Sequence, residues 1–126
     1  MLLFKKKFMD AIRSGEKTQT IRLWNHCRMR AGQRSYIPGA GYIRVLSIDP
    51  IEVDDLTDAD AVPDGFASAE RLRAELTTIY AEQLAAGHQA YRICFALLPA
   101  AEQEQARAER QEKKRRSQAS TVEGDD

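Results

Sequence analysis

Residues 15–22 read Gly15-Glu16-Lys17-Thr18-Gln19-Thr20-Ile21-Arg22. Cations and threonines follow a glycine here, at the point where a helical pattern gives way to an extended one. Before this stretch, Phe4, Phe8 and Ile12 recur at four-residue spacing, which predicts one face of a short helix, and Gly15 is typical of a helix C-cap. After it, residues 18–24 are rich in Thr, Ile, Leu and Trp, which favour a strand. The stretch therefore marks a predicted helix-to-strand junction.

The residue types at this junction can carry nucleophilic chemistry. Lys17 can act as a general base if burial lowers its pKa, with Thr18 or Thr20 as the nucleophile. Arg22 can bind a phosphate or a carbonyl oxygen. In a regular strand Lys17 and Thr20 would point to opposite faces, so this chemistry requires a turn or a bulge between them. The alternative is a basic, threonine-rich strand edge with no chemical role.

The chain up to residue 98 predicts further strands and a second helix. The strands fall at 34–37, 42–53 and 91–97, and Pro50 predicts a bulge, a bend or an edge position. Thr57 followed by Asp60 has capping-box spacing, and Ser68 is placed to cap a helix that ends near Gly87. The residues expected in the core are Phe4, Phe8, Ile12, Ile43, Val45, Ile48, Leu72, Leu76, Ile79, Ile93 and Phe95.

The pattern Gly15-x-Lys17-x-x-x-x-Arg22 resembles the signature of the ASCH (activating-signal-cointegrator homology) domain family. Matches further along the chain, such as Gly32-Gln33, Asp55-Leu56-Thr57 and Asp64-Gly65-Phe66, extend the resemblance over residues 2–98. The resemblance implies an α+β, PUA-like fold over residues 1–98. This is a small, mixed but mostly antiparallel β-barrel of about five or six strands with flanking helices.

With both threonines inside it, the motif is similar to that of small bacterial members of the family, which include N4-acetylcytidine amidohydrolases. This similarity implies that Lys17 and Thr20 are catalytic. The third catalytic residue of those enzymes, a Glu, falls within residues 61–65, where Asp64 is the nearest acidic match and Asp60 a second candidate. The implied function is hydrolysis of N4-acylated cytidine or a related modified nucleoside, in a cleft that binds RNA or nucleotides. The alternatives are a non-catalytic RNA-binding module and a ribonuclease.

The charges are distributed unevenly, although 19 basic and 19 acidic side chains cancel over the whole chain. Residues 1–48 carry a net charge of +8 and residues 49–98 one of −7. The basic half predicts a surface for a polyanion; alternatively, the two halves fold against each other and neutralise. Aromatic rings alternate with cations in this half, as nucleic-acid contacts require. The residues predicted to bind substrate or RNA are Thr18, Arg22, Trp24, Arg28, Arg30, Arg34 and Tyr36.

Residues 99–126 form a charged tail with high helix propensity and no apolar stripe. The pattern predicts a solvated, partly helical segment that leads into a disordered end. Within it, Lys113-Lys114-Arg115-Arg116 has the composition of a phosphate contact, although such runs are more often simply solvated.

Composition and spacing exclude several functional classes. No apolar run approaches the roughly 20 residues that span a bilayer, and the first residues lack the pattern of a secretory signal. We therefore expect a cytoplasmic protein with no membrane partner, in which Cys27 and Cys94 are reduced thiols. Histidine and cysteine spacings do not suit a metal, and no glycine-rich phosphate loop is present, so we expect no metal and no cofactor. We also expect a monomer.

Overall fold

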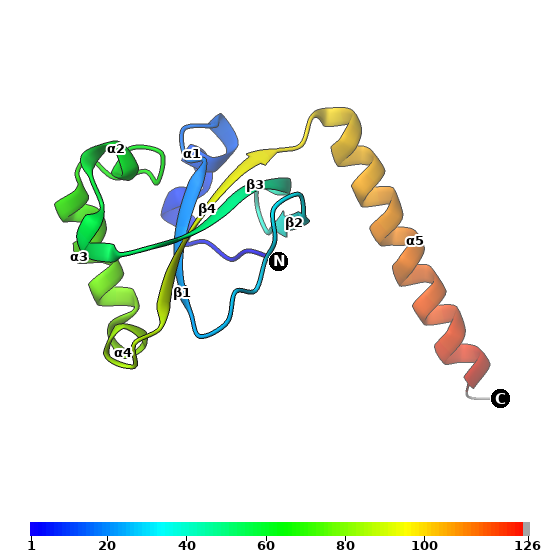
Figure 1. The fold of residues 1–126 in the computed structure, drawn as a ribbon. Helices are drawn as coiled ribbons and strands as arrows, with labels where there is room; N and C mark the ends of the chain where they lie inside the picture. Colours follow the sequence, from blue (N-terminus) through cyan, green and yellow to red (C-terminus); the bar gives the residue numbers. More distant parts are fainter. Residues whose placement is uncertain (125–126) are drawn as a thin grey trace.

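The computed structural model describes residues 1–124, with side chains described for residues 1–118 (Figure 1). Four strands form one sheet, and helices lie around it. The elements in chain order are η1 (Lys6–Phe8), α1 (Met9–Ser14), β1 (Gln19–Trp24), β2 (Arg34–Ile37), β3 (Gly41–Ile51), η2 (Val53–Asp55), α2 (Asp58–Ala61), α3 (Ala69–Ile79), α4 (Ala81–Ala85), β4 (Gln89–Leu97) and α5 (Ala100–Gly124).

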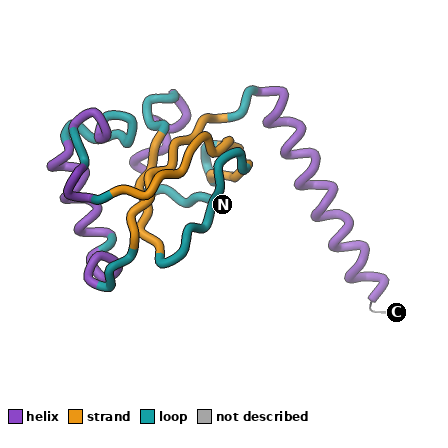
Figure 2. Tube along the Cα trace, viewed as in Figure 1, coloured by secondary structure: helices purple, strands orange, loops and turns teal. Residues whose placement is uncertain are grey.

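The strands pair in the order β1-β4-β3-β2, and every pairing is antiparallel. The long strands β3 and β4 form the centre of the curled sheet, which Figure 2 shows in orange. A bulge interrupts their register between Val45 and Ser47, and the intervening Leu46 points to solvent. Pro50 is not bulged. The strand β2 pairs only with residues 41–44 of β3, so the part of β3 that contains Pro50 has no strand on that side. The N–H that proline lacks is therefore not needed for pairing on that edge.

The N-terminal segment bridges the two edge strands of the curled sheet. The Leu2 amide donates to the Tyr36 carbonyl in β2 at 2.9 Å, and the Arg22 side chain of β1 donates to the Leu3 carbonyl at 2.7 Å. The curled sheet and this bridge together have the form of a half-barrel. The predicted α+β, PUA-like class is therefore confirmed. The described residues contain four strands rather than five or six, and residues 2–4 form a segment outside the sheet.

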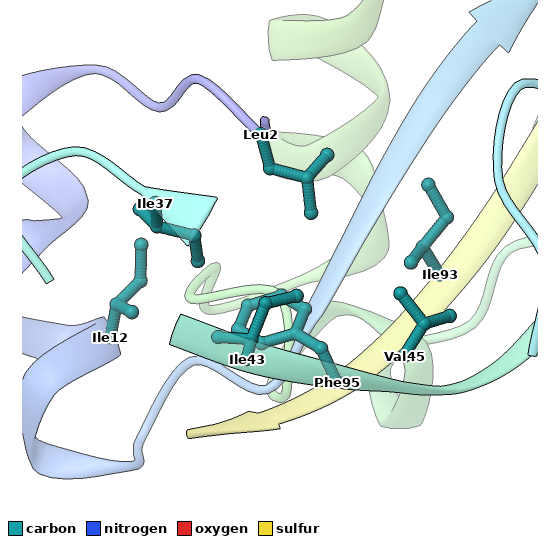
Figure 3. Close-up of a cluster of buried hydrophobic side chains, with 7 residues drawn as sticks. All are labelled: Leu2, Ile12, Ile37, Ile43, Val45, Ile93 and Phe95. Carbon is teal, nitrogen blue, oxygen red and sulfur yellow. The ribbon is translucent and has the colours of Figure 1, made fainter. Parts of the chain in front are cut away.

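Hydrophobic clusters cover both faces of the sheet. On one face the N-terminal segment and α1 pack over β3 and β4, as Figure 3 shows. On the other face α3 packs Leu72 and Leu76 over β1. Seven predicted core residues are buried: Ile12, Ile43, Val45, Leu72, Leu76, Ile93 and Phe95. Phe4, Phe8 and Ile48 are half-buried.

The prediction that Ile79 is a core residue is wrong, since its side chain is 42% exposed. The predicted single helix to Gly87 breaks at Tyr80, whose backbone leaves the helical region and divides it into α3 and α4. Ile79 is therefore the last residue of α3, beyond the turns that lie on the sheet. Both predicted helix caps are present: the Thr57–Asp60 capping box begins α2, and the Ser68 hydroxyl accepts from the Arg71 amide at the start of α3.

The predicted tail forms α5, which projects away from the sheet (Figure 1). Its first turns are docked rather than solvated. Ala106 is fully buried against Tyr42 and Leu98, and Gln103 bonds to the backbone of Tyr42. Exposed side chains occupy positions 107–118, as predicted for the tail, and residues 125–126 lie outside the described part.

Candidate functional site

The three predicted catalytic residues line one small cavity at the β1 edge of the sheet. Lys17 lies just before β1, Thr20 lies within it, and Asp64 follows α2. The cavity has a volume of about 150 Å³ and is enclosed by the N-terminal segment, β1 and α3. Its lining is Leu3, Phe4, Lys5, Phe8, Lys17, Thr20, Ile21, Arg22, Asp64, Phe66, Leu72, Glu75, Leu76, Ile79 and Tyr80.

The path of the chain before β1 allows Lys17 and Thr20 to reach the same cavity, although in a regular strand they would point to opposite faces. Gly15 adopts φ +84° and ends α1, and the Lys17 amide then donates back to the Ala11 carbonyl at 3.0 Å. A left-handed backbone of this kind suits glycine, which has no Cβ to clash. Because β1 begins only at Gln19, strand alternation does not apply to Lys17, and its side chain reaches the same cavity as Thr20.

Lys17 and Asp64 form a buried ion pair. The Lys17 side chain is 2% exposed, and its Nζ donates to Asp64 Oδ1 at 2.8 Å and to the Asp64 backbone carbonyl. Gln19 Nε2 donates to the other carboxylate oxygen at 3.1 Å, so both oxygens of Asp64 are held. The Thr18 amide also donates to the Pro63 carbonyl at 2.9 Å, which fixes the Asp64 turn beside β1. Asp64 thus reaches the lysine despite being one methylene shorter than a Glu.

The burial of Lys17 shifts its pKa downward. Burial lowers the pKa of Lys17 below 10.5, the nearby charge and hydrogen bond of Asp64 raise it in part, and the charge of Arg22 lowers it further. Contacts with two aromatic rings act in the opposite direction, because ring faces attract a cation: Nζ lies 4.7 Å from the ring centroid of Phe8 and 5.7 Å from that of Phe4. Lys17 therefore meets the condition for a general base, which is a lysine that loses its proton more readily than one in water.

Arg22 holds the Thr20 hydroxyl in place. These residues lie two apart in β1 and so share one face of the strand. Arg22 Nε donates to Thr20 Oγ1 at 3.0 Å, its Nη2 donates to the Leu3 carbonyl, and its guanidinium carbon lies 4.7 Å from the Phe4 ring centroid. The donor from Arg22 occupies one lone pair of the hydroxyl and leaves the Thr20 proton available for transfer.

The other residues predicted to bind substrate lie away from this cavity. Thr18 is exposed and is not part of the lining. Trp24 packs against Tyr91 with ring centroids 5.8 Å apart. Arg28 and Arg30 are exposed in the connection between β1 and β2. The remaining pair, Arg34 and Tyr36, belongs to β2 at the opposite edge of the sheet, next to α5. The predicted binding set is thus split into separate regions.

Sequence reasoning missed several cavity residues. Glu75 and Tyr80 line the cavity although nothing in their local sequence marks them, and Phe66 was marked only as part of the Asp64-Gly65-Phe66 match, with no role assigned. Phe4 and Phe8 were expected in the core, and they are half-buried because one side of each ring faces the cavity. Among the described residues no group of His, Cys, Asp or Glu side chains is arranged to hold a metal ion. No described helix has both the length and the apolar character needed to cross a membrane.

No protein-family model and no curated protein matches this chain. Solved structures do match it. The hypothetical protein PH0355 superposes with a TM-score of 0.65 at 16% identity, covering 76% of this chain and 95% of its own. Protein EF3133 from Enterococcus faecalis, of the family DUF984, gives a TM-score of 0.59 at 16% identity, covering 73% of this chain and 70% of its own.

An ASCH domain from Lactobacillus crispatus gives a TM-score of 0.57 at 17% identity, covering 70% of this chain and 68% of its own. At such identities the likeness is one of fold. It agrees with the half-barrel sheet and the flanking helices. The chain therefore has the PUA-like fold of an ASCH domain.

Proposed function

We propose that the cavity at the β1 edge binds the acylated base of N4-acylated cytidine, or of a related modified nucleoside, and hydrolyses its amide. The observation that carries this proposal is the buried Lys17–Asp64 pair in the same cavity as Thr20, whose hydroxyl is held by Arg22. A nucleophile, a base with a lowered pKa and a group that orients the base are the components of nucleophilic amide hydrolysis.

The size and walls of the cavity support a small, planar substrate. A volume of about 150 Å³ is well below the roughly 300–1,000 Å³ of pockets that hold drug-sized ligands. It suits one base with a short acyl group and leaves the ribose outside. Phe4, Phe8 and Phe66 supply aromatic walls against which a base can stack, and Lys17 and Arg22 supply donors for its polar edge.

In the proposed reaction Lys17, in its neutral form, takes the proton from Thr20 directly or through one water. The Thr20 oxygen then attacks the acyl carbon, and the developing negative charge on the carbonyl oxygen lies near the Arg22 guanidinium. The bond from the acyl carbon to N4 breaks, and Lys17 and Asp64 return the proton to the leaving amine. Water then attacks the ester on Thr20, with Lys17 taking its proton. The bond from the acyl carbon to the Thr20 oxygen breaks, Lys17 returns the proton to that oxygen, and the acid is released.

Turnover of N4-acetylcytidine, followed by chromatography, tests this proposal. Since a nucleophile and its base act as a unit, Thr20→Val and Lys17→Met should each remove nearly all activity. Thr18→Val is the matched control, because Thr18 lies two residues away, is exposed and does not line the cavity. It should retain most activity, with circular dichroism confirming the fold of each variant.

Other outcomes would assign the cavity differently. If several acylated cytidines remain intact while RNA is bound, the domain is a non-catalytic binding module. If RNA is cleaved and Thr20→Val stops the cleavage, the same cavity serves a ribonuclease. Equal losses in all three variants would show that the β1 junction is structurally fragile, and the assignment of base and nucleophile would then fail.

A further inference from the structure

A second concave surface lies at the opposite edge of the sheet, between α5 and the turn that joins β2 to β3. This groove has a volume of about 480 Å³. Its lining consists of Tyr36, Gly39, Ala40, Gly41, Tyr42, Arg107, Arg110, Gln111 and Lys114. Three of these described residues are cations and none is a carboxylate. Because β1 and β2 are the two edges of the sheet, the groove is separate from the Lys17 cavity.

Helical spacing places the cations of the groove in a row. Arg107, Arg110 and Lys114 stand at i, i+3 and i+7, on one side of α5. At a rise of 1.5 Å per residue, the row spans about 10 Å along the helix. The docking of Ala106 and Gln103 on the sheet holds this side of α5 toward the β2–β3 turn.

Two acidic residues of the same helix are already paired. Glu109 accepts from Arg34 of β2 at 2.7 Å, and Glu112 pairs with Arg116 at 3.2 Å within the helix. Arg107, Arg110 and Lys114 are the charged residues in the lining of the groove. Arg13 adds a further cation at its end, where Nε donates to the Gly39 carbonyl at 2.8 Å.

Aromatic rings lie beside the cations. Tyr36 and Tyr42 have ring centroids 4.9 Å apart, and the Arg110 guanidinium carbon lies 4.7 Å from the Tyr36 ring centroid. The Tyr42 hydroxyl is buried and makes no hydrogen bond of ordinary geometry among the described residues, although Arg110 is close enough to interact with it. A groove that combines a row of cations with aromatic and guanidinium planes has the two components of single-strand nucleic-acid binding.

We propose that this groove binds a single strand of RNA. Arg107 and Lys114 contact its phosphates, and a base stacks on the surface formed by Tyr36 and Arg110. A purely anionic ligand would make no stacking contact with the tyrosines, and a purely apolar ligand would leave the three cations of the groove without a partner. The proposal does not depend on the chemistry of the Lys17 cavity.

Fluorescence anisotropy of the full chain with a labelled oligouridine strand, at several salt concentrations, tests the proposal. The first variant is Arg107→Ala/Lys114→Ala, which keeps Arg110 on the tyrosines. The matched control is Lys6→Ala/Arg71→Ala, which removes the same charge from exposed positions on η1 and α3.

The groove variant should bind about tenfold more weakly at moderate salt. The slope of log K against log salt should become shallower by about 1.4, because two phosphate contacts are lost. The control should change affinity by less than about twofold and keep the slope. Equal losses in both variants, or an unchanged slope in the groove variant, would overturn the proposal.

The base contact is tested with Tyr36→Leu and two probes, oligouridine and inorganic polyphosphate. Loss of a stacking partner should weaken RNA binding about fivefold or more and leave polyphosphate binding unchanged. If Tyr36→Leu weakens both probes equally or neither, the groove does not read bases and the assignment to RNA is wrong. Thermal unfolding of each variant shows whether its fold is retained.

Discussion

At the residue scale, the Lys17–Asp64 pair is the group on which both stability and chemistry depend. Its side chains are 2% and 5% exposed, so each charge would be left in a poorly solvated place without the other. We predict that Asp64→Leu lowers the free energy of unfolding by about 3–5 kcal/mol, because Lys17 is then buried and unpaired. Urea denaturation measures the change.

The double variant Lys17→Met/Asp64→Leu separates the loss of the pair from the loss of volume. Replacing both charges by apolar groups of similar size should recover most of the stability lost in Asp64→Leu. If the double variant is as unstable as the single one, the cost comes from packing at the Asp64 turn rather than from an unpaired lysine.

The lowered pKa of Lys17 also predicts the direction of pH dependence. In the folded protein the lysine loses its proton below 10.5, the value for an exposed lysine. Hydrolysis should therefore rise with pH through the folded pKa, since the neutral amine is the base. A wild-type rate that falls as the pH rises towards 10.5 would contradict the assignment of Lys17 as the base.

The lowered pKa of Lys17 also predicts how the free energy of unfolding depends on pH. Between the folded pKa of Lys17 and 10.5, the unfolded chain binds more protons than the folded one, so raising the pH in this window stabilises the fold. The slope should be reduced in Lys17→Met. Unfolding curves at several pH values measure it.

The sequence predicted part of the site at this scale. The motif marked Lys17 and Thr20, but the choice between Thr18 and Thr20 depends on where β1 begins, and this follows from the turn at Gly15. The role of Gln19 could not be predicted, because its partner Asp64 lies 45 residues away. Contacts of that kind are set by tertiary structure and leave no local pattern.

At the scale of elements, docking of α5 depends on one glutamine. Gln103 accepts from the Tyr42 amide at 2.9 Å and donates to the Tyr42 carbonyl at 2.7 Å, as a neighbouring strand would. We predict that Gln103→Ala lowers the free energy of unfolding by about 1–3 kcal/mol, because the Tyr42 amide loses its partner, while the Tyr42 carbonyl keeps the bond from the Leu98 amide. Thermal unfolding measures the loss, and Gln105→Ala, at an exposed position of the same helix, is the control.

Gly41 supports the same contact. A Cβ at Gly41 would stand 2.9 Å from Gln103 Oε1, and the backbone there has φ +120°. The sequence predicted strands at 34–37 and 42–53 on either side of this glycine but not this contact. It likewise predicted α5 as a solvated helix, because Ala106 and Gln103 do not form an apolar stripe. Docking through one small residue and one side-chain amide produces no hydrophobic periodicity, so the sequence pattern does not predict it.

At the scale of the whole molecule, the uneven charge of the chain is partly neutralised within the fold. Lys5 and Lys7 pair with Glu75, and Lys17 pairs with Asp64, so basic residues of the first half meet acidic residues of the second. Arg34 pairs with Glu109 of α5. These pairs agree with the alternative that the two halves fold against each other. The groove beside α5 draws its cations from the tail, so it is not the surface that the basic half predicted.

Truncation tests whether α5 belongs to the folded domain. Removing residues 100–126 would expose Tyr42 and Leu98 and leave the Tyr42 backbone without Gln103, which we expect to cost about 2 kcal/mol, or roughly 10 °C in Tm. Removing only residues 112–126 spares Gln103, Ala106 and the Arg34–Glu109 pair, so Tm should change little. Circular dichroism of both chains against the full protein makes the comparison. If the two truncations have the same small effect, the domain ends at Leu98 and α5 is an appendage; if only the longer one lowers Tm, the first turns of α5 are part of the fold that forms the groove.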